Sequence, residues 1–587
     1  MDFCRTSRSV AFAVCIIPAV LSCRGVSAAK DNPDDICTRG ALGSAVPEPA
    51  DLRSQNGELK VELAFRSSVD SQGQTRYCYV DKAGNQSPTL RVKPGDHVTL
   101  TLRNELAASP EAHSMAAHAG SAGKDCSGGA MTASSTNLHF HGLVIPPVCH
   151  QDDVLKTLVQ PSSPPFEYSF QIPLDQPPGL YWYHPHVHGF TKNQILGGAS
   201  GALIVEGMET VNSEVSGLPE RVLVIRDQEL MNPNAAPVQT DSMPAPQVLK
   251  DAEGDILNNG TGGGKPAKDL SINFVPVPYP EYQPAAIRMK PHEKELWRVL
   301  NASAITYLDL QVLFKDWQQT VGVVALDGIP VNANGNREQI LLKRHVLIPP
   351  GGRAEFIVKA PKEGIPASLV TRTIDTGPAG ENDPTRPLAS IVASADAPEP
   401  RSHLPASPAT LVAVHGTPLK EIAPVRERKL YFSETPQDPK NPNSPTVFYL
   451  TVDGKTPAPF DPNSPNPDIV VRQGDVEDWI IENRSQELHD FHIHQLHFQL
   501  LEWNGVPVDE PYLRDTINVA YWSGHNPVYP SVKLRMDFRD PNIVGTFVYH
   551  CHLLEHEDGG MMGTIRVEPR DANVKKDEKS TGVRGSR

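Results

Sequence analysis

Histidines separated by a single residue are the clearest chemical signal in this sequence. The chain has 21 His among 587 residues, so chance would produce about one such pair. Five pairs occur, namely His139/His141, His184/His186, His186/His188, His492/His494 and His550/His552. Because imidazole nitrogens are common ligands of transition metals, this spacing predicts metal sites.

The spacing has a geometric consequence if these segments are β-strands. Side chains two residues apart project from the same face of a strand, and the residue between them projects from the other face. Residues 550–552 would then present two imidazoles on one face and Cys551 on the other. In the same way, His492 and His494 share a face, whereas His489 lies on the opposite one.

Two different metal sites follow from this alternation. One set combines two imidazoles, a thiolate and a thioether, which are His489, His556, Cys551 and Met561. This combination matches a blue-copper electron-transfer site. The other set contains only imidazoles, which are His139, His141, His184, His186, His492, His494, His550 and His552. Eight imidazoles are too many for one metal ion, but they suit a three-copper cluster with positions open to dioxygen.

The elements that must position these side chains belong to a threefold repeat. A pattern of alternating apolar residues, a polar turn, a second apolar strand and a final Asn occurs at residues 90–104, 287–301 and 469–483. Such alternation is typical of half-buried strands joined by a turn. The spacing of the repeats is that of whole domains. The sequence therefore predicts an all-β fold of three similar sandwich or barrel domains, with the metal sites between the first and third.

Composition sets the expected domain boundaries. Three domains are expected at residues 36–207, 218–394 and 428–569. The Pro- and Ala-rich residues 395–427 are typical of a linker, and the charged residues 570–587 are typical of a flexible tail. Residues 107–135 are rich in Ala, Ser and Gly and are predicted to form an insertion in the first domain.

Residues 1–29 have the features of a signal peptide. Two arginines precede an apolar run at residues 10–21, and Val-Ser-Ala at residues 26–28 offers a cleavage site. The run is too short to span a bilayer, and no later segment approaches a membrane span. We therefore expect export to a periplasm or to the medium.

Cysteine usage agrees with an oxidising compartment. Five of the eight Cys follow the signal segment, namely Cys37, Cys78, Cys126, Cys149 and Cys551. Because Cys551 has the neighbours of a metal ligand, the other four can form two disulfides, whose pairing the sequence leaves open. The formal charge of −15 argues against a nucleic-acid partner.

Four segments together resemble the multicopper oxidase family, which includes laccases. They read HFHG (139–142), YWYHPH (181–186), HDFHIH (489–494) and HCHLLEHEDGGM (550–561). The resemblance covers essentially the whole chain after residue 29. It implies three cupredoxin-like Greek-key domains and an oxidase that reduces dioxygen to water.

The resemblance also implies ligands for four copper ions. The type 1 ligands would be His489, Cys551, His556 and Met561, and the type 2 ligands would be His139 and His492. The pair of type 3 ions would be bound by His141, His184, His186, His494, His550 and His552.

Carboxylates near these ligands are expected to serve proton transfer. Glu557 matches the acidic residue that relatives use near the cluster. Asp152, with Asp153 as the alternate, follows the first segment; it could relay protons or orient a ligand histidine. Asp490 stands where many members have Pro, so it could affect donor preference or copper potential.

Two donor classes are compatible with these motifs. The leading hypothesis is laccase-like oxidation of phenols or aromatic amines, and the alternative is oxidation of Cu(I) or another metal ion in detoxification. None of the ten Met cluster near the entrance of the third domain, which weakens a Cu(I) specialisation. A copper store or a structural protein would not need a complete ligand set with an electron bridge. The expected partners are dioxygen and a small reducing substrate or metal ion, and the oligomeric state is left open.

Overall fold

The computed structural model describes residues 36–107, 126, 130–161, 163–237, 249–251, 254–408, 410–411, 417–441 and 444–570. The predicted signal peptide, most of the predicted insertion at 107–135 and the predicted tail after residue 570 lie outside these residues. Within them, strands dominate and the three α-helices are short. No helix in the described part is long and apolar enough to cross a membrane.

The first pair of sheets is formed by residues 51–205. Its strands are β1 (Asp51–Arg53), β2 (Glu58–Val69), β3 (Thr75–Asp81), β4 (Thr89–Val92), β5 (His97–Asn104), β6 (His139–His141), β7 (Phe166–Gln171), β8 (Gly179–His184) and β9 (Gly201–Val205), and α1 (Thr191–Leu196) connects the last two. The sheets have the orders β1-β4-β9-β8-β6 and β3-β2-β5-β7. In β5, the buried Val98, Leu100 and Leu102 alternate with more exposed residues and contribute to the core of this domain.

The second pair of sheets lies between residues 219 and 403. After α2 (Met208–Val211) and η1 (Ser213–Val215), its strands are β10 (Pro219–Gln228), β11 (Asp269–Ile272), β12 (Val275–Val277), β13 (Ala285–Met289), β14 (Lys294–Asn301), β15 (Leu308–Phe314), β16 (Trp317–Gln318), β17 (Val321–Leu326), β18 (Ile329–Pro330), β19 (Leu341–Lys343), β20 (Val346–Ile348), β21 (Arg353–Lys359), β22 (Ala367–Thr371), β23 (Arg386–Ala393) and β24 (Ser402–His403). The main orders are β12-β11-β10-β14-β21-β17-β18 and β13-β23-β22-β15-β16. Strand β24 falls in the predicted linker 395–427 and pairs with β10, so part of that stretch joins the second sheet pair.

The third pair of sheets extends from residue 426 to 568. After η2 (Leu419–Glu421), its elements are β25 (Arg426–Pro436), β26 (Thr446–Val452), β27 (Ile469–Arg472), β28 (Val476–Asn483), β29 (His489–Ile493), β30 (Phe498–Trp503), β31 (Val506–Pro507), β32 (Leu513–Arg514), β33 (Thr516–Val519), β34 (Ser531–Asp537), η3 (Pro541–Ile543), β35 (Gly545–Cys551), α3 (Leu554–Asp558) and β36 (Met562–Glu568). The main orders are β26-β25-β28-β34-β30-β31 and β27-β36-β35-β29-β33.

The asparagine that ends each sequence repeat has the same role in all three sheet pairs. Asn104, Asn301 and Asn483 are buried, and each side-chain amide donates to two backbone carbonyls. Each side-chain oxygen also accepts the amide two residues later. A buried carbonyl without a donor costs about 1–3 kcal/mol. The final Asn of the repeat is therefore explained by the turn that it stabilises.

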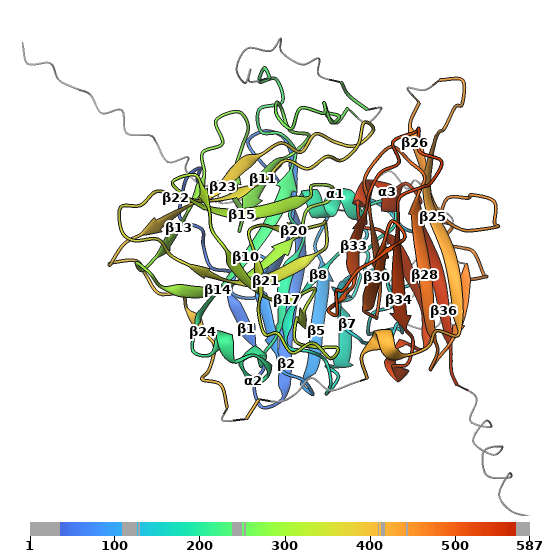
Figure 1. Ribbon diagram of the computed structural model, residues 1–587, viewed down its shortest axis with the longest axis horizontal. Coiled ribbons are helices and arrows are strands. Elements are labelled where there is room, and N and C mark those ends of the chain that lie inside the picture. The colour runs from blue at the N-terminus through green and yellow to red at the C-terminus, as the bar shows by residue number, and fades with distance from the viewer. Residues whose placement is uncertain are drawn as a thin grey trace, which may run out of the picture.

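The first and third sheet pairs meet at helices α1 and α3, which lie side by side (Figure 1). Asp558 at the end of α3 accepts the backbone amides of Gly189, Thr191 and Lys192 at the start of α1. A common apolar cluster contains Trp182 of the first pair together with many residues of the third. This junction holds the histidine segments of both domains together.

Two disulfides are present, as expected from the cysteine count. Cys37 pairs with Cys78, and Cys126 pairs with Cys149. Cys551 is buried and unpaired with another cysteine among the described residues. The pairing that the sequence left open is thus set by contacts within the first domain.

Candidate metal centre

The thiolate site is formed by strands β29 and β35 with the α3 segment. The two strands are antiparallel, with Phe491 opposite Cys551 and His492 opposite His550. Residues of one parity therefore share a face across both strands, which places His489 on the same face as Cys551. The alternation expected from the sequence is the one that the structure has.

The side chains of this site converge. The Sγ atom of Cys551 lies 3.7 Å from Nδ1 of His489 and 3.7 Å from Nδ1 of His556. The two Nδ1 atoms are 3.1 Å apart. Met561 is buried beside them, its carbonyl accepts the Cys551 amide, and its amide donates to the His556 carbonyl. Two nitrogens and a sulfur facing a common point, with a methionine alongside, form a donor set of the blue-copper kind.

The other eight histidines predicted as ligands form a second cluster, on the opposite side of Cys551. Four come from β6, the end of β8 and the residues that follow β8, and four come from β29, β35 and the residues that follow these two strands. The rings of His139 and His494 stack with centroids 3.7 Å apart, and those of His141 and His492 stack at 3.9 Å. Nε2 of His550 lies 3.4 Å from that of His186 and 3.3 Å from that of His494.

Several ring nitrogens in this cluster are buried without a hydrogen-bond partner among the described residues. They are Nε2 of His139, His184 and His492, Nδ1 of His141 and His494, and both nitrogens of His552. An uncompensated buried polar atom costs about 1–3 kcal/mol. Several ring nitrogens with free lone pairs in one buried cluster are suited to binding several copper ions, because imidazole is a preferred copper ligand.

In four of these rings, those of His139, His141, His184 and His492, the opposite nitrogen lies against an oxygen, which determines the tautomer. Nδ1 of His139 lies 3.0 Å from Asp152, and Nδ1 of His184 lies 2.9 Å from the Pro185 carbonyl. Burial, followed by the neighbouring histidines, holds the pKa of His141 and His494 well below the usual value. The imidazoles are therefore neutral at pH 7, which is the form that binds metal.

The carboxylates predicted near the cluster have different positions. Both Asp152 oxygens contact His139 Nδ1, and Oδ1 also accepts the Phe140 amide. This geometry favours the orienting role over proton relay. Asp153, the alternate, has no histidine contact in the described structure, and burial raises its pKa to about 6.

Glu557 lies behind two histidines from different domains. Its Oε1 is 3.6 Å from Nδ1 of His186, and its Oε2 is 3.4 Å from Nδ1 of His550. Burial raises the pKa of Glu557 well above the usual range, and the charge of Asp558 adds to this effect. A carboxyl group whose protonated form is favoured by burial next to the cluster is suited to proton donation.

Asp490 contacts the chain around Cys551. Its Oδ1 accepts the amides of His552 at 2.7 Å and Leu553 at 3.1 Å, and it lies 3.4 Å from Cys551 Sγ. Burial raises the pKa of Asp490 to about 7. The residue therefore secures the backbone that leaves Cys551 and does not face a donor.

Two glutamates that sequence reasoning missed contact the outer edge of the thiolate site. Oε1 of Glu434 is 2.8 Å from Nε2 of His489, and Oε1 of Glu487 is 3.3 Å from Nε2 of His556. The imidazoles are 0% and 2% exposed, whereas the glutamate side chains are 14% and 6% exposed. The carboxylates, not the rings, thus form the outer layer. No residue spacing predicts these contacts, because Glu434 lies on β25 and Glu487 on a loop.

Asp515 is a third residue that the sequence did not single out. Its Oδ1 lies 3.3 Å from Nε2 of His141, and its backbone carbonyl is 2.8 Å from Nδ1 of His492. Asp515 is an acidic residue between the short strands β32 and β33, and this position alone did not indicate a contact with the histidines.

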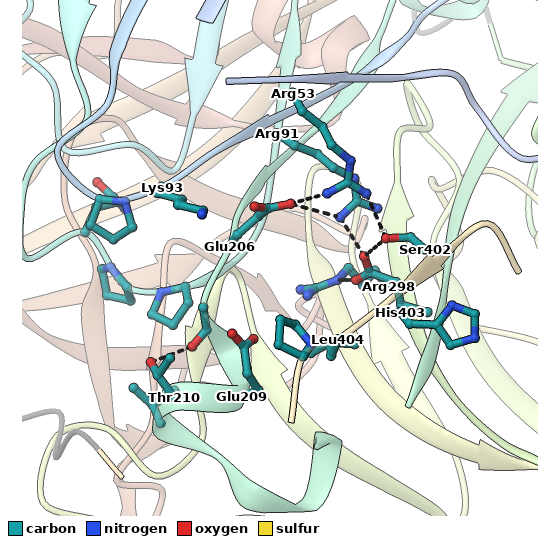
Figure 2. Close-up of a pocket in the computed structure, with 18 of the residues that line it drawn as sticks. Arg53, Arg91, Lys93, Glu206, Glu209, Thr210, Arg298, Ser402, His403 and Leu404 are labelled. Carbon is teal, nitrogen blue, oxygen red and sulfur yellow. Dashed lines mark hydrogen bonds and ion pairs between the residues drawn. The ribbon is translucent and has the colours of Figure 1, made fainter. Parts of the chain in front are cut away.

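A cavity of about 630 Å³ lies elsewhere, between the first and second sheet pairs. Figure 2 shows Arg53, Arg91 and Arg298 in ion pairs or hydrogen bonds with neighbouring side chains, among them Glu206 and Ser402. None of the twelve predicted copper ligands lines this cavity. We therefore assign the chemistry to the histidine clusters.

Comparisons with known proteins agree with this assignment. The multicopper oxidase family models match residues 130–210 and 439–571, which contain all four histidine segments. A multicopper oxidase of Staphylococcus haemolyticus is 24% identical over 488 residues, covering 82% of this chain and 81% of the relative. An iron transport multicopper oxidase of Gibberella zeae is 23% identical over 523 residues, covering 82% and 71%.

A solved structure shows the same fold. It is a multicopper oxidase from Campylobacter jejuni described as a metallo-oxidase, with a TM-score of 0.61, 22% identity and coverage of 90% of this chain and 96% of that one. The prediction of an all-β fold with three cupredoxin-like domains is confirmed. The chain belongs to the multicopper oxidase family, whose members are copper oxidoreductases that use dioxygen.

Proposed function

We propose that this multicopper oxidase takes electrons one at a time from a metal ion in a low oxidation state and reduces dioxygen to water. The observation that carries the choice of donor is the pair of glutamates on the outer nitrogens of His489 and His556. Carboxylate oxygens suit hard divalent cations such as Fe²⁺ or Mn²⁺.

The ligand roles that we propose follow the convergence of ring nitrogens. The thiolate site is assigned to type 1 copper, with His489, Cys551, His556 and Met561. His186, His494 and His550 would hold one type 3 ion, since their Nε2 atoms approach one another. The other type 3 ion is assigned to His141, His184 and His552, and the type 2 ion to His139 and His492. Four bound copper ions would supply four one-electron redox centres, which matches the four electrons that dioxygen needs to form two waters.

The chain itself provides the connection between the two sites. Cys551 is bonded in sequence to His550 and His552, and its carbonyl lies 2.8 Å from Nδ1 of His550. The sulfur and the two imidazoles are thus joined by a few covalent bonds and one hydrogen bond. Glu557 stands beside this connection and donates protons to the water-forming side.

The burial of the type 1 histidines favours a small donor. An aromatic substrate oxidised by direct contact needs an exposed imidazole edge, whereas the His489 ring is fully buried in the described structure. A cation bound by Glu434 and Glu487 would be connected to each imidazole through a carboxylate and one hydrogen bond. Electron transfer then needs no contact with the rings.

Laccase-like oxidation remains the second candidate, and a specific observation favours it. Trp522 and Tyr529 pack with ring centroids 5.2 Å apart, and the Trp522 amide donates to the Ser485 carbonyl. The Ser485 hydroxyl lies 2.8 Å from Nε2 of His489. An aromatic donor could stack on this surface next to the type 1 side.

We also propose that the protein acts after export. The two disulfides of the first domain and the signal-like residues 1–29 support an oxidising compartment. A periplasm and the extracellular medium are both compatible with these features.

Oxygen uptake by the copper-loaded protein tests the choice of donor. Rates are compared for Fe²⁺, Mn²⁺, Cu⁺ and a phenol, in the wild type and in a Glu434→Gln/Glu487→Gln variant. We expect the variant to raise KM for the metal ion by about 10- to 100-fold, because carboxylate ligands are lost, with little change for the phenol.

A surface variant, Glu58→Gln, serves as the matched control, since the Glu58 side chain is 41% exposed and its ion pair in the described structure is with Lys60. Turnover of the phenol alone would instead support the laccase-like alternative. No oxygen uptake with any donor, despite full copper loading, would reject the proposed activity.

A further inference from the structure

We propose that Arg353, which the second domain contributes, is a positioning residue for the histidine cluster. It holds Asp515 against a ligand histidine from the first domain and one from the third, so all three domains meet at the cluster. This inference rests on the ligand roles proposed above. The second domain supplies none of the twelve predicted ligands, so its part in the site comes from contacts of this kind.

The guanidinium of Arg353 is fully buried, and each of its nitrogens has a partner. Nη1 and Nη2 lie 2.7 Å from Oδ1 and Oδ2 of Asp515, in the bidentate geometry that is specific to arginine. Nε donates to the carbonyl of Leu180 on β8, and Nη2 also donates to the carbonyl of Asp327. One side chain thus bonds to the first, second and third domains.

Asp515, held in this position, contacts both His141 and His492. With Oδ1 next to His141 Nε2, that nitrogen donates its proton and Nδ1 keeps its lone pair; Nδ1 is one of the buried nitrogens without a partner. In His492 the other ring nitrogen carries the proton, because Nδ1 donates to the Asp515 backbone carbonyl and Nε2 keeps the lone pair. A single residue therefore selects the tautomers of two ligands.

Two glycines show how closely the domains approach at this point. A Cβ atom on Gly142, the last residue of HFHG, would lie 2.4 Å from Arg353 Nη2 and 2.9 Å from Asp515 Oδ2. A Cβ atom on Gly351, two residues before Arg353, would lie 2.7 Å from Nε2 of His552. Both glycines have positive φ, of +86° and +78°. The backbone of the second domain is therefore packed directly against a ligand ring.

A second residue of the same domain supports the arrangement. One Asp327 oxygen accepts the Arg353 amide at 2.9 Å, and the other accepts the amides of Asp515 and Thr516 at 3.2 and 3.3 Å. His497 approaches from the other side, with Nε2 3.4 Å from Asp515 Oδ2. Asp515 is thus held at its backbone and at its carboxylate, and loss of Arg353 would leave a buried charge without its cationic partner.

The test uses Arg353→Lys in the copper-loaded protein, because Lys keeps the charge and loses the bidentate geometry. We expect the blue type 1 absorption to persist while the three-copper site binds its ions about 10- to 100-fold more weakly, as for other residues that orient metal ligands. Copper counting after dialysis against a chelator, near-ultraviolet absorption of the type 3 pair and the type 2 electron paramagnetic resonance signal measure this without turnover.

Arg298→Lys is the matched control. Arg298 is equally buried in the second domain and pairs with Glu220 and Glu355, neither of which contacts a copper-ligand histidine in the described structure. This variant should lose stability while keeping the signals of the three-copper site. Equal loss of those signals in both lysine variants would overturn the positioning role and indicate a general effect of destabilisation.

Asp515→Asn provides a second route if Arg353→Lys fails to fold, because it keeps the size of the side chain and removes the ion pair. We expect the same selective weakening. Unchanged three-copper signals in a folded variant of either residue would overturn the inference and leave the proposed function intact. A wild-type protein that binds only one copper would instead overturn the proposed ligand roles.

Discussion

The two metal sites of this oxidase are built in different ways. The type 1 side draws all four proposed ligands from residues 489–561 of one domain, on two neighbouring strands and the short segment that follows them. The cluster of eight histidines is divided between the first and third domains, and the second domain secures it through Arg353. The first site can form when one domain folds, whereas the second requires three domains to dock.

The carboxylates around the two sites differ in the same sense. At the proposed type 1 side, the Glu434 side chain is 14% exposed and that of Glu487 is 6% exposed. Asp152, Asp515 and Glu557 around the cluster are fully enclosed. With the proposed roles, one side would receive electrons from outside, and the other would orient ligands and deliver protons.

The largest effect is expected from Cys551→Ser, which removes the one free thiol of the described residues and the proposed link between the sites. Blue absorption should disappear and oxygen consumption should fall by more than about 1000-fold, since the sulfur that connects the two proposed centres is lost. The signals of the three-copper site should remain. Blue absorption in the variant would contradict the assignment of the type 1 ligand.

Glu557→Gln should leave the type 1 side unchanged and slow turnover by about 100-fold, the usual scale for loss of a positioned acid. Burial raises the pKa of Glu557 and so favours the protonated acid, whose donation is lost as pH rises through the raised pKa. The variant should lack that decline. Oxygen uptake as a function of pH, with the blue absorption as the control, measures both effects.

Asp490→Ala should destabilise the third domain by about 2–4 kcal/mol, because the buried amides of His552 and Leu553 lose their acceptor. Asp490→Asn keeps an acceptor oxygen and should cost about 1 kcal/mol or less. Denaturant unfolding of the copper-free protein gives the difference between the variants. Equal stability of the two would show that these hydrogen bonds do not secure the segment after Cys551.

The smallest effect is expected at the junction of α1 and α3. Lys192 pairs with Glu555 across the first and third domains, and Lys192→Met removes a partly exposed ion pair worth about 0.5 kcal/mol. Copper should leave the cluster slightly faster under a chelator, while the type 1 site is unaffected. Faster loss of type 1 copper would argue against the separation of the two sites.

Much of this architecture was predictable from the sequence. The opposite orientation of Cys551 and its flanking histidines is a property of any extended strand, so it needed no knowledge of the rest of the chain. The final Asn of each repeat marked a turn that all three domains share. The pairing of cysteines was not predictable, because several connections satisfy the same count.

The sequence by itself determined which residues are the candidate ligands and on which faces of their strands they lie, because periodicity is a local property. Only the tertiary structure decided that Arg353 and Asp515 meet beside His141, that Asp152 orients His139, and that Glu434 and Glu487 cover the type 1 histidines. These contacts join residues far apart in the chain. They exist only because the three sandwich domains pack in one arrangement, which residue spacing and composition do not predict.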